Sequence, residues 1–183
     1  MQDLTPGLDY HLCMIKFENY KLGENDELVE VTTSEEHRTA AIMMLQQAHH
    51  SIDIVSRELD PLVYDTPQFA EAARHLILTG VRPRIRVIVS SPETIVRRGH
   101  RLVETAMNLT SFFDLRKAGE EHKNFNISLF VVDATGYIRR LSSERYEGTL
   151  NFNDRRESQL LMNEFEEMWA KAVPDINLRR LSL

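Results

Sequence analysis

Polar side chains that suit an anionic ligand gather in one stretch of this sequence, residues 126–157. Those that we expect to contact a ligand are Asn126, Ser128, Asp133, Thr149, Asn151 and Glu157. Amide and hydroxyl groups donate hydrogen bonds to an oxyanion or a polar ligand. They supply neither the imidazole base nor the fixed positive charge that covalent phosphoryl transfer uses. The stretch therefore predicts a binding pocket more readily than a catalytic centre.

Arginines in the same stretch are candidates for the positive charge of such a pocket. They are Arg139, Arg140 and Arg155. A guanidinium fork matches phosphate and carboxylate oxygens, and we include Arg140 among the ligand-binding candidates. The alternative is that these arginines pair with acidic side chains nearby. Those acidic neighbours are Glu144, Glu147, Asp154 and Glu157.

Two histidines are weak candidates for a nucleophile. His122 precedes Lys123 in the polar segment AGEEHKNF, and His100 lies in RRGHR. The alternative is that both are ordinary titratable groups at loop or helix edges. The histidines lack the spacing of a metal site, and the single cysteine, Cys13, excludes a zinc site of the multi-cysteine type. We therefore expect no metal and no cofactor.

The elements that would position these residues follow from hydrophobic periodicity and capping signals. Thr33 and Glu36 have the spacing of a capping box, and Pro67 suits the first turn of a helix. We expect helices over 34–49, 67–79, 93–109 and about 161–172, and strands over 11–17, 51–55, 84–89, 112–116, 127–132 and 137–140. Strand, helix and strand between 51 and 89 are typical of a parallel crossover. The sequence predicts one α/β domain with a mixed, largely parallel sheet between helices.

The order of these segments resembles one catalytic half of the phospholipase D superfamily over residues 35–172. The likeness rests on SIDIVSREL, TGVRPRIRVIVS, a strand ending at Asp133, Gly148-Thr149-Leu150-Asn151, Glu157 and a closing helix with Trp169. In that superfamily, His-x-Lys-x4-Asp and Gly-Ser-x-Asn motifs from two halves meet in one active site. Counting back from Asp133 places Asn126 at the His position and Ser128 at the Lys position. The resemblance therefore implies a degenerate half that has lost the His-x-Lys pair.

The resemblance and the composition together give the expected function. The leading hypothesis is a non-catalytic phospholipase D-like domain, a pseudoenzyme that acts as a ligand-binding, protein-interaction or regulatory module. The chain is also similar to an uncharacterised bacterial domain found C-terminal to acetyltransferase-type proteins, which implies an acetyltransferase partner. The paired halves of the superfamily imply a homodimer. A phosphate-containing or anionic ligand is expected. The alternatives are a divergent phosphodiesterase or nuclease active as a dimer, and a nucleic-acid-binding module.

Composition places limits on these functions. An apolar fraction of 42% with 27% charged residues is that of a soluble globular domain, and no run approaches the roughly 18 apolar residues of a membrane span. The net charge of −6 argues against a general nucleic-acid coat. The start, MQDLTPGLDYHL, lacks the pattern of a secretory signal, so we expect a cytoplasmic protein. We expect residues 1–30 to be an N-terminal extension and 31–183 to form the domain.

Overall fold

A computed structural model describes residues 16–107 and 111–174, and it contains one eight-stranded sheet. The strands lie in the order β1-β7-β6-β5-β2-β3-β4-β8. Their bounds are β1 Val29–Val31, β2 Ser51–Ser56, β3 Arg84–Val89, β4 Phe113–Lys117, β5 Ser128–Val132, β6 Gly136–Arg140, β7 Gly148–Asn151 and β8 Val173–Pro174. The mixed sheet between helices is confirmed.

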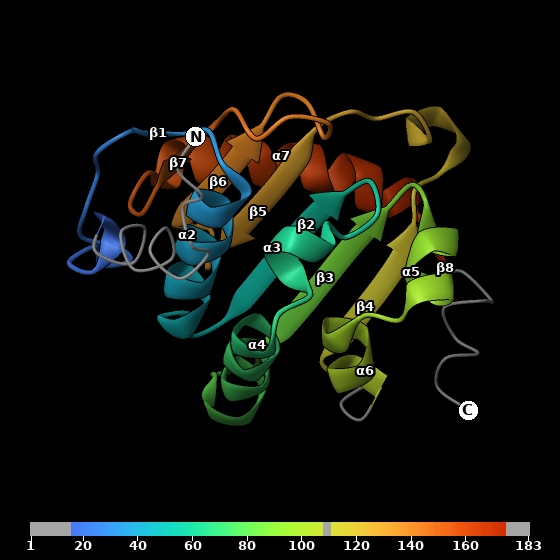
Figure 1. Cartoon of the computed structure of the whole chain (residues 1–183), viewed down its shortest axis with the longest axis horizontal. Coiled ribbons are helices and arrows are strands. Elements are labelled where there is room, and N and C mark those ends of the chain that lie inside the picture. The colour runs from blue at the N-terminus through green and yellow to red at the C-terminus, as the bar shows by residue number, and fades with distance from the viewer. Residues whose placement is uncertain (1–15, 108–110, 175–183) are drawn as a thin grey trace, which may run out of the picture.

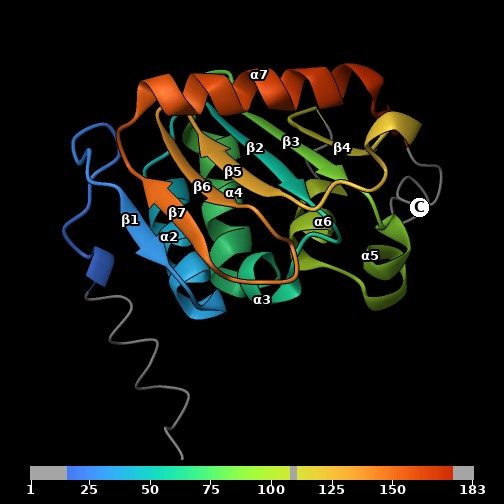
Figure 2. The same cartoon turned by 90° about the horizontal axis from the view of Figure 1, so that it is seen from above.

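The helices form two layers, one on each face of the sheet (Figures 1 and 2). The helices are α2 Ser34–Gln46, α3 Pro61–Tyr64, α4 Pro67–Thr79, α5 Pro92–Arg98, α6 Arg101–Met107 and α7 Arg155–Lys171, with a 3₁₀ turn η1 at Glu120–His122. Helix α7 alone covers one face in Figure 2, and the other helices lie on the opposite side. No helix among the described residues is long and apolar enough to span a membrane.

The alternation of side chains along β5 assigns residues to the two faces. Phe130 and Val132 pack in the larger hydrophobic cluster with α2, α3 and α4. Leu129 and Val131 pack in the smaller cluster with Leu161, Phe165 and Met168 of α7. Because successive side chains of a strand point to opposite faces, this pattern fixes the orientation of every paired residue on β6 and β7 as well.

The parallel part of the sheet is smaller than the sequence indicated. Only the pairs β2·β3 and β3·β4 are parallel, and the remaining five pairs are antiparallel. The reason is that β5 enters antiparallel to β2 and is followed by two further antiparallel strands, β6 and β7. The polar edge residues of β5, β6 and β7 therefore meet at the carboxyl end of β2.

Two expected elements differ from the structure. The single helix expected over 93–109 is wrong, because α5 and α6 are separate helices divided at Gly99, whose φ is +74°. A left-handed residue cannot continue a right-handed helix, and glycine adopts that conformation without steric cost. The expected strand over 11–17 lies mostly outside the described residues, and its last members, Lys16 and Phe17, are helical.

The described part of the N-terminal segment packs on the sheet. Strand β1 pairs antiparallel with β7, with Val31 opposite Gly148. The buried ring of Phe17 stacks on Phe152 at a centroid distance of 6.3 Å, and Tyr20 contacts both rings. The capping box of α2 is present as expected, because the Thr33 hydroxyl accepts a hydrogen bond from the Glu36 amide.

Candidate functional site

The candidate site lies at the sheet edge where β2 ends, β5 begins, β6 ends and β7 begins. Three residues lie side by side there, with Ser128 opposite Arg140 and Arg140 opposite Gly148. All three share the face that carries Phe130 and α2. In open α/β sheets, ligands bind at the carboxyl ends of the parallel strands, which is the edge that β2 and β3 form here.

Arg140 is the centre of this site, and its side chain is only 3% exposed. Its Nη1 and Nη2 atoms each donate to Oδ2 of Asp60 at 3.2 Å. Nη2 also donates to the Ser128 hydroxyl at 3.3 Å. The guanidinium carbon lies 4.9 Å from the ring centroid of Tyr146, a cation–π distance. The positive charge is therefore buried, paired and covered by an aromatic ring.

Asp60 holds this arrangement together from the loop that follows β2. Its Oδ1 atom accepts hydrogen bonds from the Leu62 amide at 3.1 Å and from the Tyr146 hydroxyl at 3.3 Å. Its side chain is 14% exposed, against 3% for Arg140, and Tyr146 is half-buried. Asp60 and Tyr146 are thus closer to solvent than the guanidinium. The preceding residue, Leu59, has a φ of +54°, which is sparsely populated for a leucine.

Two further side chains enclose the buried charge. Burial raises the pKa of Tyr64 to about 12, so its phenol is neutral beside Ser128 and Arg140. Burial, together with the positive charge of Arg140, lowers the pKa of His37 to about 3. The His37 Nδ1 atom lies 3.2 Å from the Thr33 carbonyl oxygen and must donate to it, so Nε2 is a lone-pair acceptor. That Nε2 atom is buried without a hydrogen-bond partner among the described residues.

Sequence reasoning identified Arg140 and Ser128 but missed Asp60, Tyr146 and His37. The acidic neighbours considered for Arg140 all follow it closely in the chain, whereas Asp60 lies 80 residues away. The one local signal for Asp60 was its place before Pro61, which is typical of a helix start. His37 lies in the first turns of α2, and no residue close to it in the sequence indicates that it lies beside Arg140.

Asn126 lies in the segment before β5 and takes part in a loop contact. Its Oδ1 atom accepts from the Ser143 hydroxyl at 2.7 Å and from the Ser143 amide at 3.2 Å. The Ser143 amide also donates to the Asn126 carbonyl oxygen at 2.7 Å. Asn126 therefore ties the start of β5 to the loop between β6 and β7.

Thr149 and Asn151 of the Gly-Thr-x-Asn segment face the other side of the sheet, whereas Gly148 lies on the Arg140 face. Thr149 lies opposite Arg139 and Asn151 opposite Tyr137, and Tyr137 packs in the cluster with α7. Asn151 is buried, donates to the Asp26 carbonyl oxygen at 2.9 Å and accepts from the Asn153 amide at 2.8 Å. Its amide therefore fixes the N-terminal segment and the turn that leads into α7.

Glu157 and Asp133 also have partners in the fold. Glu157 pairs with Arg139 at 3.3 Å, one of the pairings considered from sequence. Asp133, at the opposite end of β5 from Ser128, accepts three backbone hydrogen bonds. Its donors are the amides of His49, His50 and Ser51 at 2.7–2.9 Å. The structure thus brings Ser128 and Arg140 together and places the other candidates elsewhere.

Among the described residues, no hydrogen bond joins either histidine candidate to Arg140 or Ser128. His100 is buried, its Nδ1 accepts from the Leu102 amide at 3.2 Å, and its Nε2 lies 3.0 Å from the Leu59 carbonyl oxygen. Burial lowers the pKa of His100. His122 ends the 3₁₀ turn η1, and its Nε2 atom is buried without a partner in the described residues. Among those residues, no three His, Cys, Asp or Glu side chains are grouped to hold a metal ion.

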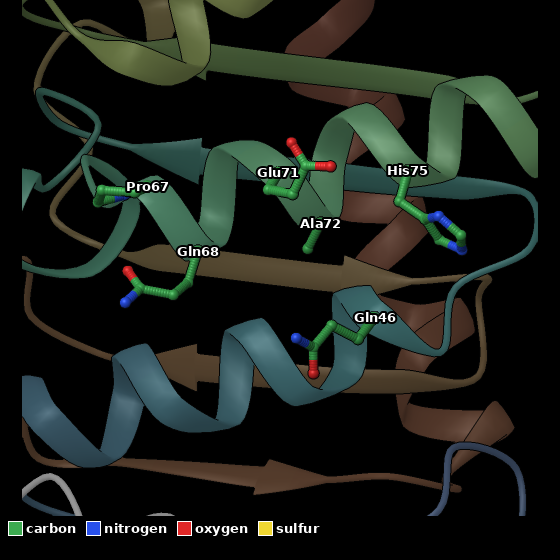
Figure 3. A pocket seen from close by; sticks show the side chains of 6 residues that line it. All are labelled: Gln46, Pro67, Gln68, Glu71, Ala72 and His75. Carbon is green, nitrogen blue, oxygen red and sulfur yellow. The ribbon is translucent and has the colours of Figure 1, made fainter.

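A separate pocket lies between α2 and α4 (Figure 3). Its volume is about 470 Å³, and its lining residues are Gln46, Pro67, Gln68, Glu71, Ala72 and His75. In Figure 3 the side chains of Gln46 and Gln68 extend into the space between the two helices. None of the candidate ligand-binding or nucleophile residues predicted from the sequence lines this pocket. Gln46 lies at the opposite end of α2 from the first turns that carry His37.

The fold is a mixed α/β fold that is similar to the fold of phospholipase D family members. The chain belongs to the family described as a domain of unknown function, DUF7931, whose model matches residues 33–181. No curated protein matches the chain. Nuc, a phospholipase D family member from Salmonella typhimurium, superposes with a TM-score of 0.52 at 10% identity, over 80% of this chain and 97% of Nuc. NucT from Helicobacter pylori gives 0.55 at 14% identity, over 81% of this chain and all of NucT (100%).

A third solved structure is that of TrmBL2, an archaeal chromatin protein whose structure shows a novel mode of DNA binding. It superposes with a TM-score of 0.61 at 14% identity over 91% of this chain. The matched region is 60% of TrmBL2, so this chain spans about three fifths of that protein. At these identities the likenesses establish the fold.

Proposed function

We propose that this chain is a non-catalytic phospholipase D-like domain that binds a phosphate-containing or other anionic group at the Arg140 edge and acts as a regulatory module. The observation that carries the proposal is the hydrogen bond between Arg140 and Ser128, because Ser128 is the residue that the resemblance in sequence aligns with the superfamily's lysine. A guanidinium serves phosphate recognition as well as an ammonium does and adds a planar fork of donors.

The contacts of Asn126 and His37 support a non-catalytic role. Asn126 stands at the histidine position, and its amide is engaged by Ser143. His37 lies next to Arg140, but its Nε2 atom is buried. A phosphorus atom needs an open approach of about 3–3.5 Å to its nucleophile, which this packing does not leave.

A protein partner is the second part of the proposal. Leu62 and Leu141 are 55% and 72% exposed and follow closely after Asp60 and Arg140 in the chain. Exposed apolar side chains beside a polar site suit a protein contact. The partner class expected from the resemblance is an acetyltransferase or a second copy of this chain. Light scattering of the purified chain tests whether a second copy is the partner. A strictly monomeric protein would contradict self-association.

Nucleic-acid binding is a second candidate, supported by the likeness to TrmBL2 and by one surface feature. Arg97 and Arg98 are exposed in the last turn of α5, and α5 begins at the same sheet edge as the Arg140 site. Binding carried by these arginines would weaken steeply with ionic strength and would be reduced by Arg97→Gln with Arg98→Gln. Affinity for DNA that is insensitive to both changes would count against this candidate.

The anion-binding proposal is tested by calorimetric titration with inorganic phosphate and with a nucleoside monophosphate. We expect weak binding by the wild type that is lost in Arg140→Gln. Arg145→Gln is the matched control, because it removes the same charge from an exposed side chain in the neighbouring loop. Equal binding by the wild type and by Arg140→Gln would show that the Arg140 edge is not the site.

A further inference from the structure

The anion position at Arg140 is filled by a residue of the same chain. Oδ2 of Asp60 accepts from both terminal nitrogens of Arg140 at 3.2 Å, the geometry that a phosphate oxygen would adopt on the same fork. We propose that Asp60 is an intramolecular substitute for the phosphate group, an autoinhibitory contact that must open before a phosphate-bearing ligand binds Arg140. This inference rests on the proposed function of the Arg140 edge.

The charge balance of the site favours competition over simultaneous binding. His37 is neutral, since its pKa is about 3, and the phenol of Tyr64 is neutral as well. Arg140 is therefore the one cation within this buried group, and Asp60 is its anionic partner. A phosphate placed beside an undisplaced Asp60 would put two anions on one guanidinium in a poorly solvated place, which is costly. Phosphate binding therefore requires the Asp60 carboxylate to move away from Arg140.

The position of Asp60 makes that movement feasible. Its side chain is the more exposed member of the pair, so it can rotate outward without rearrangement of the sheet. The backbone before it is already irregular, with Leu59 at φ +54° and Asp60 at φ −28° and ψ 108°. Leu59 is itself fully buried, and its carbonyl oxygen is held by His100, which keeps the loop in place while the Asp60 side chain moves.

Tyr146 is the second component of this autoinhibitory contact. Its hydroxyl donates to Oδ1 of Asp60, and its ring covers the guanidinium of Arg140. Loss of that hydroxyl removes a bond that holds the carboxylate inward but leaves the ring over the cation. Tyr146→Phe is therefore expected to open the site partly, whereas Asp60→Asn removes the competing charge and keeps an oxygen that can accept the Leu62 amide.

The test is calorimetric titration of inorganic phosphate into the full chain near neutral pH, at constant ionic strength. We expect Asp60→Asn to bind phosphate about tenfold or more tightly than the wild type, because a charge-assisted intramolecular competitor is removed. Tyr146→Phe should give a smaller gain of the same sign. Glu144→Gln is the control: it also removes one negative charge at this edge, but Glu144 pairs with Arg57.

The outcomes separate the autoinhibitory contact from the site itself. Asp60→Asn with Arg140→Gln should lose the gained affinity, which shows that phosphate occupies the guanidinium. Equal affinity for phosphate in Asp60→Asn, Glu144→Gln and the wild type would overturn the autoinhibitory role of Asp60. It would not contradict the anion site at Arg140. No phosphate binding by any variant would overturn both. If Asp60→Asn does not fold, Tyr146→Phe is the deciding variant. A phosphate affinity of Tyr146→Phe no higher than that of the wild type would then contradict the autoinhibitory contact.

Discussion

Ser128 and Asn151 point to opposite faces of the sheet. Ser128 lies opposite Arg140 and Gly148 on the face covered by α2, whereas Asn151 lies opposite Tyr137 on the face covered by α7. Ser128 and Asn151, which the resemblance in sequence aligns with the Lys and Asn of the superfamily motif, therefore do not converge on one phosphoryl group within this chain. What they form instead is a buried arginine site on one face and a structural amide on the other.

Asn151 and Asn126 should respond differently to truncation. Asn151→Ala removes two hydrogen bonds from a buried amide, one to Asp26 and one from Asn153. We expect it to lower the free energy of unfolding by about 1–3 kcal/mol. Asn126 is exposed, and Asn126→Ala should cost about 1 kcal/mol or less. Urea denaturation measures both, and an equal loss in the two variants would contradict the assignment of Asn151 to the fold.

Asp133 is expected to be one of the strongest polar anchors in the chain. Asp133→Ala leaves the amides of His49, His50 and Ser51 without their acceptor and should cost about 2–4 kcal/mol. Asp133→Asn should cost less, because asparagine keeps one acceptor oxygen and tolerates the positive φ of +51° at this position. Thermal unfolding of both variants, beside exposed Glu147→Gln, checks the order. Equal losses of stability in Asp133→Ala and Asp133→Asn would contradict the role of the Asp133 side-chain oxygens as acceptors for the three amides.

His37 should give the fold a specific sensitivity to acid. Its pKa is lowered from 6.5 to about 3, because burial and Arg140 disfavour the cation. Between those values the unfolded chain binds the proton and the folded chain does not, so this contribution to stability is intact above pH 6.5 and is lost as pH falls toward about 3. The expected slope is up to about 1.4 kcal/mol per pH unit.

The measurement for His37 is the pH dependence of the free energy of unfolding, compared with His37→Asn. Asparagine keeps a donor for the Thr33 carbonyl oxygen but does not titrate, so the acid slope should flatten even if overall stability falls. His75→Asn, at an exposed position on α4, is the control and should keep the wild-type slope. Parallel curves for the wild type and His37→Asn would contradict a buried neutral His37.

The ion pair on the α7 face offers a separate test of packing. Arg86 donates to the buried Asp53 at 2.6 Å and to the exposed Glu166 at 2.8 Å, and its guanidinium lies 5.2 Å from the ring of Trp169. Arg86→Met leaves the Asp53 carboxylate buried without its partner and should cost about 3–5 kcal/mol.

Glu166→Gln removes only the outer partner, which is 52% exposed, and should cost about 1 kcal/mol or less. Trp169 is the single tryptophan of the sequence, so its fluorescence reports unfolding in both variants. Similar losses in the two variants would show that Asp53 does not depend on Arg86.

Local signals in the sequence account for most of the elements. Thr33 with Glu36 and Thr66 before Pro67 marked the starts of α2 and α4, because both are short-range capping patterns. The apolar run from Ile127 to Val132 indicated β5. The orientation of Asn151 was not predictable, because it depends on the register of β6 against β7. Asp60 was missed for the same physical reason, since its contact with Arg140 joins the loop after β2 to the end of β6, 80 residues away in the chain.

The most direct test of the central claim is phosphodiester hydrolysis by the purified wild-type chain between about pH 5 and pH 9, with bis(p-nitrophenyl) phosphate as substrate. The claim is that the residues at the superfamily's catalytic positions hold the fold and an arginine site, and so perform no chemistry. We expect no turnover above the rate without protein. Turnover that disappears in His100→Ala or His122→Ala would contradict the account and would identify the chain as a divergent phosphodiesterase.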